Sequence, residues 1–142
     1  MKNFMDDQDF LLSTKTGEEL FHNFAEGMPI VDYHCHISPK EIWDDKRFEN
    51  ITEVWLGGDH YKWRLMRANG VDERFITGDA PAREKFQKWA ETLGRCVGNP
   101  VFEWSHLELK RYFGYEGVLN GKTAQEVWDL ANAKLAEASF TC

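Results

Sequence analysis

Two histidines separated by one residue, His34 and His36, are the side chains of this sequence best suited to hold a metal ion. Side chains alternate between the two faces of an extended strand, so both imidazoles would point the same way. Neutral imidazole is a good ligand for Zn, Mn, Fe or Co. Asp32 has the same parity and can orient a ligand from the outer shell. The alternative is that both histidines are ordinary residues of a strand.

A second group of reactive side chains lies in the segment GGDHYKWR, which begins at Gly57 and ends at Arg64. Its two glycines let a ligand approach the backbone closely, and the helix start that follows favours anions. His60 can act as a base and Tyr61 as a phenol donor, while Lys62 and Arg64 add positive charge. A sugar acid presents the matching groups: a carboxylate, several hydroxyls and a carbon acid. The alternative is a capped helix start whose aromatic residues only pack.

Two further histidines, His106 and His22, carry titratable rings on predicted helices. His106 stands in the segment WSHLELKR, in which Ser105 to Glu108 could form a local capping arrangement. A helix histidine in such a setting is predicted to be packed or hydrogen-bonded rather than a ligand. We therefore predict structural roles for both.

One strand is predicted to position the histidine pair. The segment Ile30–His36 begins with β-branched residues and is bounded by Pro29 and Pro39, which is typical of a strand. The sequence SPKE that follows is a capping box with proline at the first helical position, so a short helix begins there. Strand followed by helix is the first step of a β/α architecture. A lone strand needs neighbours, so its partner strands are expected in further sequence or in another chain.

Helical spacing and capping residues dominate the rest of the chain. One helix carries the apolar stripe Phe86, Trp89, Ala90 and Leu93. The predicted helices are one opened by Thr16, one at Pro39, one from Asn50 to Gly57, one from His60 to Asn69, one from Pro81 to Leu93, one from Asn99 to Gly114, and one opened by Thr123.

The composition limits the function classes. The chain has 142 residues, suited to one domain, and a net charge of -7, which argues against nucleic acid as a partner. No apolar run reaches the roughly 20 residues of a membrane span, and the first residues lack a signal-peptide layout. Cys35, Cys96 and Cys142 are too far apart for a CxxC pair. We predict a cytoplasmic protein with free thiols that contacts neither nucleic acid nor membrane.

Three segments in this order resemble uronate isomerases of the amidohydrolase superfamily. They are DYHCHISP around His34 and His36, GDHYKWRLMRANGV from Gly58, and GNPVFEWSHLELKRYFG from Gly98. The HxH pattern is shared across the superfamily, whereas the other two segments are more specific. The resemblance runs from about Phe10 to about Ala138, nearly the whole chain.

The resemblance implies a distorted (β/α)8 barrel, of which residues 1–142 would be the amino-terminal portion, mostly α-helical with one short strand near 30–35. It implies interconversion of D-glucuronate with D-fructuronate and of D-galacturonate with D-tagaturonate, in hexuronate breakdown. It also implies a divalent metal, often zinc, held at His34 and His36 and by an aspartate late in the full chain. Residues matching His60 and Tyr61 line the family's substrate pocket.

The chemistry of aldose–ketose isomerisation needs a base at carbon and charge stabilisation at oxygen. Tyr61 is the candidate for proton transfer, His60 for hydrogen bonds to substrate oxygens, and Arg64 for the substrate's negative charge. A whole barrel takes about 250 residues, and a catalytic zinc has about three protein ligands. We therefore expect this chain alone to be inactive, and to pair with the remaining barrel sequence or with itself.

Two other functions stay open at this point. One is a non-catalytic helical binding or regulatory module derived from the enzyme, which would keep the fold and lose the metal. The other is an amidohydrolase-type hydrolysis of a small amide or ester, against which the GDHYKWR segment argues.

Overall fold

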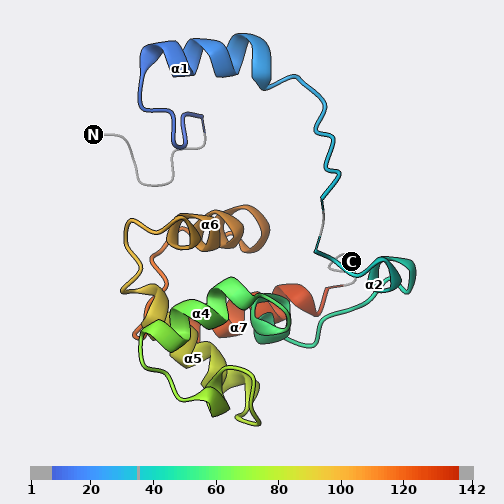
Figure 1. The fold of residues 1–142 in the computed structure, drawn as a ribbon, viewed down its shortest axis with the longest axis vertical. Helices are drawn as coiled ribbons and strands as arrows, with labels where there is room; N and C mark the ends of the chain where they lie inside the picture. Colours follow the sequence, from blue (N-terminus) through green and yellow to red (C-terminus); the bar gives the residue numbers. More distant parts are fainter. Residues whose placement is uncertain (1–7, 35, 138–142) are drawn as a thin grey trace. The chain divides into compact units, whose positions relative to one another are not determined.

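The computed structural model describes residues 8–34 and 36–137 of the chain. The chain divides into two compact units, Met1–Ser38 and Pro39–Cys142, and each is described by itself. All regular structure longer than one residue in the described part is helical (Figure 1). The expectation of a mostly α-helical chain is therefore confirmed for these residues.

The first unit contains one helix, α1 (Lys15–Leu20), which continues as a π-helical turn, η1 (Phe21–Ala25). Its N-cap is Thr14, whose Oγ1 accepts a hydrogen bond from the Gly17 N–H at 3.0 Å. The prediction that Thr16 caps this helix was wrong, because Thr16 already lies inside it. Thr14 and Thr16 both precede acidic residues, but the helix begins after Thr14.

The predicted strand Ile30–His36 was also wrong for the residues that the structure describes. Residues 30–34 form no helix and pair with no strand, and Ile30 and Val31 are 94% and 79% exposed. The physical reason is that strand N–H and C=O groups need a neighbouring strand to bond, and the described residues form none. Cys35, within the predicted strand, lies outside the described residues.

The second unit is a group of helices. In chain order they are α2 (Pro39–Trp43), α3 (Ile51–Leu56), α4 (His60–Ala68), the 3-10 turn η2 (Glu73–Phe75), α5 (Ala82–Leu93), α6 (Pro100–Glu108), the π-helical turn η3 (Leu109–Phe113) and α7 (Ala124–Leu135). Each predicted helix of this unit is present, with its ends shifted by a few residues at most.

Side-chain caps explain why the helices of this unit begin where they do. The Asn50 side chain accepts from the Glu53 N–H at 3.1 Å at the start of α3, and Asn99 accepts from the Val101 N–H at 3.0 Å at the start of α6. At the other end, Gly114 follows η3 with φ of 72°, a left-handed conformation that favours glycine.

The core of the second unit is built around α5. Its predicted stripe, Phe86, Trp89, Ala90 and Leu93, is wholly buried. Figure 1 shows α5 lying beside α4 and α7, and α5 also contacts α3. Burying each large side chain of this stripe stabilises the unit by about 2–3 kcal/mol.

Aromatic packing and one buried amide fix α3 against this core. The Trp55 ring lies 6.1 Å from the Phe86 ring, centroid to centroid. The Ile51 N–H at the start of α3 donates to the Asn132 side chain of α7 at 2.9 Å. Three residues separate α3 from α4. The start of α4 therefore lies close to a helix that packs against the core.

Candidate active site

The two metal-candidate histidines converge on one point in the first unit. The Nε2 atoms of His34 and His36 lie 2.9 Å apart, and their ring centroids are 4.9 Å apart. Both residues are exposed. They point to the same side, as expected for residues two apart in an extended segment. The Asp32 carboxylate accepts a hydrogen bond from the backbone N–H of His34 at 3.1 Å, so it fixes the backbone rather than a ring.

This geometry fits two ligands of one metal ion. Zinc–nitrogen bonds in a tetrahedral site place two ligand nitrogens about 3.3 Å apart, so a small rotation of either ring from the observed 2.9 Å would suffice. Within the described residues, no group of three or more His, Cys, Asp or Glu side chains is arranged to hold a metal. His34 and His36 can therefore supply two ligands, and any others must come from elsewhere.

In the second unit, Asp59 caps the start of α4. Its Oδ1 accepts from the Tyr61 N–H at 3.0 Å and from the Lys62 N–H at 3.1 Å. The sequence predicted a helix start that favours an anion, and the structure shows that a carboxylate of the chain itself already occupies these two N–H groups. A substrate anion would need side chains rather than these amides.

The three predicted substrate residues of this unit lie together on the outside of α4. The His60 and Tyr61 rings are 4.4 Å apart, centroid to centroid, and tilted by 31°. The Arg64 guanidinium carbon lies 5.5 Å from the Tyr61 ring centroid, within the range of a cation–π contact. All three side chains are exposed, Tyr61 by 57%. The Tyr61 phenol, with the His60 imidazole and the Arg64 guanidinium beside it, suits an anionic ligand that carries several hydroxyl groups.

Lys62 points the other way, into the unit. It is only 8% exposed, and its Nζ lies 2.6 Å from Asp59 Oδ2 and 5.9 Å from the Trp55 ring centroid. Trp55 in turn donates from Nε1 to the Glu108 carboxylate at 2.7 Å. Lys62 was expected to add positive charge for a substrate, but its charge is directed at Asp59 and Trp55.

Partial burial affects the pKa values of the Glu108 and Asp59 carboxyls. Desolvation raises the pKa of Glu108, against the opposing Lys62 charge and the Trp55 hydrogen bond. Desolvation also acts to raise the pKa of Asp59, but the hydrogen bond and charge of Lys62, together with the two backbone N–H groups, bring that pKa below its usual value. These contacts thus favour the charged form of the Asp59 carboxylate.

The sequence reading missed the link between Glu108 and Trp55. The two residues are 53 positions apart, and helical spacing carries no information about which helices meet. The available signal was a glutamate among apolar residues of α6, where an uncompensated carboxylate would be costly.

The remaining histidines have structural roles, as predicted. His106 is buried and uses both ring nitrogens: Nδ1 is 2.6 Å from the Phe102 carbonyl oxygen, and Nε2 accepts from the Leu119 N–H at 2.9 Å. His22 pairs with Asp9 and Glu26, each at 3.0 Å. The carboxylate of Asp9, and secondly that of Glu26, raises the His22 pKa.

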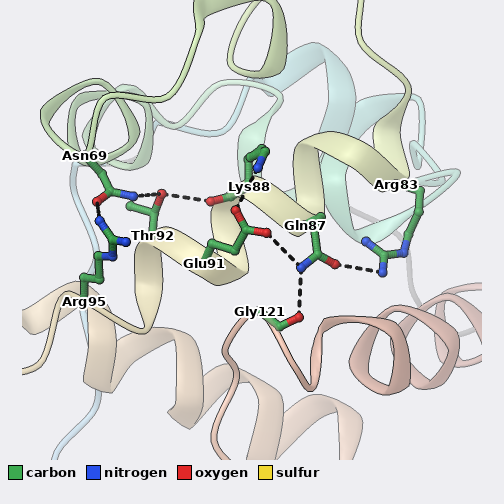
Figure 2. Close-up of polar contacts among 8 residues, drawn as sticks. All are labelled: Asn69, Arg83, Gln87, Lys88, Glu91, Thr92, Arg95 and Gly121. Atoms are coloured by element: carbon green, nitrogen blue, oxygen red, sulfur yellow. Dashed lines mark hydrogen bonds and ion pairs between the residues drawn. The ribbon is translucent and has the colours of Figure 1, made fainter.

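A surface hollow of about 330 Å³ lies between the end of α4 and α5, and several of its polar side chains are bonded to neighbouring side chains. Figure 2 shows Asn69 donating to Thr92 at 3.1 Å and accepting from Arg95 at 3.0 Å. Beside them, Lys88 lies 2.9 Å from Glu91. The hydrogen bond between Asn69 and Thr92 ties the end of α4 to α5, and none of the predicted site residues lines this hollow.

The predicted site residues fall in both units, His34 and His36 in the first, His60, Tyr61 and Arg64 in the second. Each group is arranged as described above within its own unit. No helix in the described part of the chain is long and apolar enough to cross a membrane.

A family model described as glucuronate isomerase matches residues 1–142. The uronate isomerase of Lachnospira eligens is 70% identical over 141 residues, which is 99% of this chain and 30% of that protein. The uronate isomerase of Endomicrobium trichonymphae is 64% identical over the same shares.

A solved structure agrees with these relatives. The crystal structure of uronate isomerase from Thermotoga maritima superimposes with a TM-score of 0.86 at 40% sequence identity, covering 94% of this chain and 29% of that one. The chain thus spans about a third of the length of the relatives it matches, at their amino-terminal end.

Proposed function

This chain belongs to the glucuronate isomerase family, and from that premise we propose that it is the amino-terminal part of a uronate isomerase. The reaction would interconvert D-glucuronate with D-fructuronate and D-galacturonate with D-tagaturonate, in the cytoplasmic breakdown of hexuronates. The observation that carries this proposal is the 70% identity to a uronate isomerase across 99% of the chain.

The proposal extends to the fold. The segment Ile30–His34 would be the first strand of a (β/α)8 barrel of the amidohydrolase type, with its neighbours supplied by sequence beyond this chain. Its residues are exposed and pair with no strand in the described part of the chain, which supports this, because a strand is stable only beside another. In such barrels, side chains at the carboxyl end of a strand face the active site, and His34 and His36 would lie at that end.

His34 and His36 would hold a divalent metal, zinc by family resemblance, together with ligands from outside the described residues. Their converging Nε2 atoms and their exposure support this role. When bound, such an ion would polarise substrate oxygens and stabilise negative charge on them.

The side chains of α4 would act on the substrate. In the aldose-to-ketose direction, a proton leaves C2, an enediol forms, a proton is returned to C1, and the hydroxyl proton moves from O2 to O1. We assign proton transfer to the Tyr61 hydroxyl, hydrogen bonding to substrate oxygens to His60, and attraction of the substrate carboxylate to Arg64. Their shared exposed position on α4 supports this division of roles.

The two alternative functions are not favoured. A non-catalytic module descended from the enzyme has no need of a converging histidine pair together with the intact HYKWR segment. A hydrolase of small amides or esters has no support among the relatives described above, which are uronate isomerases.

A fusion protein tests the function with this chain's own residues. Residues 1–142 would be joined to the part of the Lachnospira eligens uronate isomerase that this chain does not cover. We expect Tyr61→Phe in this fusion to lower kcat about a hundredfold, the usual size of a lost proton-transfer group. Tyr112→Phe is the matched control, because Tyr112 is 62% exposed on a different turn and should leave kcat unchanged. Equal kcat values in the two variants would refute the assignment of Tyr61.

A further inference from the structure

Lys62 has one of the few buried charged side chains in the described part of the chain. Moving such a charge out of water is costly unless it is paired. Lys62 Nζ is paired with Asp59 Oδ2 at 2.6 Å. The same Asp59 uses its other oxygen to accept from the N–H groups of Tyr61 and Lys62.

On its inner side, Lys62 Nζ lies 5.9 Å from the ring centroid of Trp55, whose indole is bonded to the partly buried carboxylate of Glu108. Glu108 lies close enough for the Lys62 charge to act on it, and Glu108 is itself anchored by the 2.7 Å hydrogen bond from the Trp55 indole. Trp55 is 3% exposed and stacks against Phe86 in the core. A continuous series of contacts therefore leads from the core to the first turn of α4.

The first turn of α4 is also tied to the end of α3 by the Trp63 indole, which donates from Nε1 to the Leu56 carbonyl at 2.8 Å. His60 and Tyr61 are exposed, so their side chains contribute little core packing. A cap carboxylate bonded only through one oxygen can rotate, whereas one bonded through both oxygens has a fixed orientation. Lys62 supplies the bond to the second oxygen of Asp59.

We propose that Lys62 and Glu108 are positioning residues that fix His60 and Tyr61 through the Asp59 cap. Neither side chain touches the substrate in this account. The inference rests on the proposed function only for what His60 and Tyr61 do, and not for how they are held.

Amide hydrogen exchange on the 142-residue chain tests the positioning directly. In Lys62→Met, we expect the amides at positions 61 and 62 to exchange about five- to tenfold faster, the size of a weakened cap. The contact between the His60 and Tyr61 rings should weaken in NOE spectra. Lys62→Arg should restore most of the protection, because it keeps the charge.

Lys88→Met is the matched control for this experiment. Lys88 also pairs with a carboxylate three residues away, Glu91 at 2.9 Å, but on a half-exposed face of α5. It should leave positions 61 and 62 unchanged. Unchanged protection at these positions in Lys62→Met would overturn the proposal.

The core amide of Leu93, which is wholly buried, reports whether a variant still folds. If Lys62→Met also loses protection at Leu93, amide exchange in the isosteric variant Glu108→Gln tests the positioning role instead. It keeps an acceptor for Trp55 but removes the charge facing Lys62, so we expect faster exchange at positions 61 and 62 with Leu93 intact. No change at these positions would refute the role of Glu108.

Kinetics of the fusion protein separate this inference from the function. We expect Lys62→Met to lower kcat on the order of tenfold or more, the effect of a displaced catalytic group, and Lys88→Met to leave it unchanged. Equal kcat values in the two would contradict the positioning role. A fusion protein without any turnover would refute the proposed function, whereas the exchange measurements would still decide how Lys62 and Glu108 act.

Discussion

Three histidines of this chain show how local surroundings divide ligand candidates from structural residues. His106 is buried with both ring nitrogens bonded to backbone groups, so it has no nitrogen left for a ligand. His34 and His36 are exposed and direct their Nε2 atoms at one another. A metal ion that enters between these two nitrogens would replace a hydrogen bond by two coordinate bonds.

We expect the isolated chain to bind one zinc ion through His34 and His36, and to lose that binding in His34→Ala. Isothermal titration with Zn²⁺ alone measures this. His22→Ala is the control, because His22 is engaged by Asp9 and Glu26. Zinc binding that survives in His34→Ala, or that is lost in His22→Ala, would contradict the assigned ligands.

The stability of the chain should fall as the pH drops below about 6.5 because of His106. Burial lowers the His106 pKa from its usual 6.5, so the unfolded chain binds more protons near and below that pH, and protonation favours unfolding. The geometry agrees, since a protonated Nε2 would face the Leu119 N–H.

Urea unfolding of wild type and His106→Gln between pH 7.5 and 5.5 checks this prediction. The variant should lose about 1–3 kcal/mol at pH 7.5 through a broken buried hydrogen bond, and its stability should then depend less steeply on pH. His22 has a raised pKa and the opposite pH dependence, but it is present in both proteins and cancels in the difference. Identical slopes would rule out His106 as the cause.

Local side chain–backbone pairs could be predicted at this scale, whereas distant pairs could not. Asp59 was recognised as the cap of α4 because a cap depends on residues two or three positions away. The direction of Lys62 depends on Trp55 and Glu108, which reach it only after three helices have packed. No spacing rule contains that information.

At the scale of elements, helices were easier to predict than the strand. A helix satisfies its backbone internally, so Asn50, Asp59 and Asn99 could be identified from the sequence as the points where helices begin. The segment Ile30–His34 has a strand's composition, but strand pairing requires another segment. The described part of the chain contains no such partner segment, so a strand predicted from composition alone was wrong.

Substitution of the two threonines at the start of α1 tests which of them is the cap. Thr14→Ala should weaken the helix by about 1 kcal/mol, because Gly17 loses its hydrogen bond. Thr16→Ala, within the helix, should have little effect or stabilise it slightly, since alanine is the better helix former. Amide exchange of residues 17–25 measures both. A larger effect from Thr16→Ala would show that Thr16 caps the helix, as the sequence predicted.

For the whole molecule, the first unit carries apolar side chains without cover in the described residues. Phe24, Met28, Ile30, Val31 and Tyr33 are each at least 66% exposed. Surfaces of this kind mark places where other protein packs. The proposed occupant in the full-length enzyme is the rest of the barrel.

Without that occupant, we expect the isolated chain to self-associate through residues 28–33. Analytical ultracentrifugation should show oligomers that dissociate in Val31→Glu. Val97→Glu is the control, because Val97 is similarly exposed, 76% against 79%, but lies in the second unit. A clean monomer of the wild-type chain at high concentration would count against this surface.

The central claim, that this chain carries the amino-terminal part of a working uronate isomerase site, has one most direct test. It is the turnover of D-glucuronate with zinc by the fusion of residues 1–142 to the remaining part of the Lachnospira eligens relative. We expect turnover comparable to that of the relative. We expect none from the 142-residue chain alone, because His34 and His36 are the two candidate metal ligands that its described residues bring together. A folded fusion protein without activity, or full activity from the isolated chain, would contradict it.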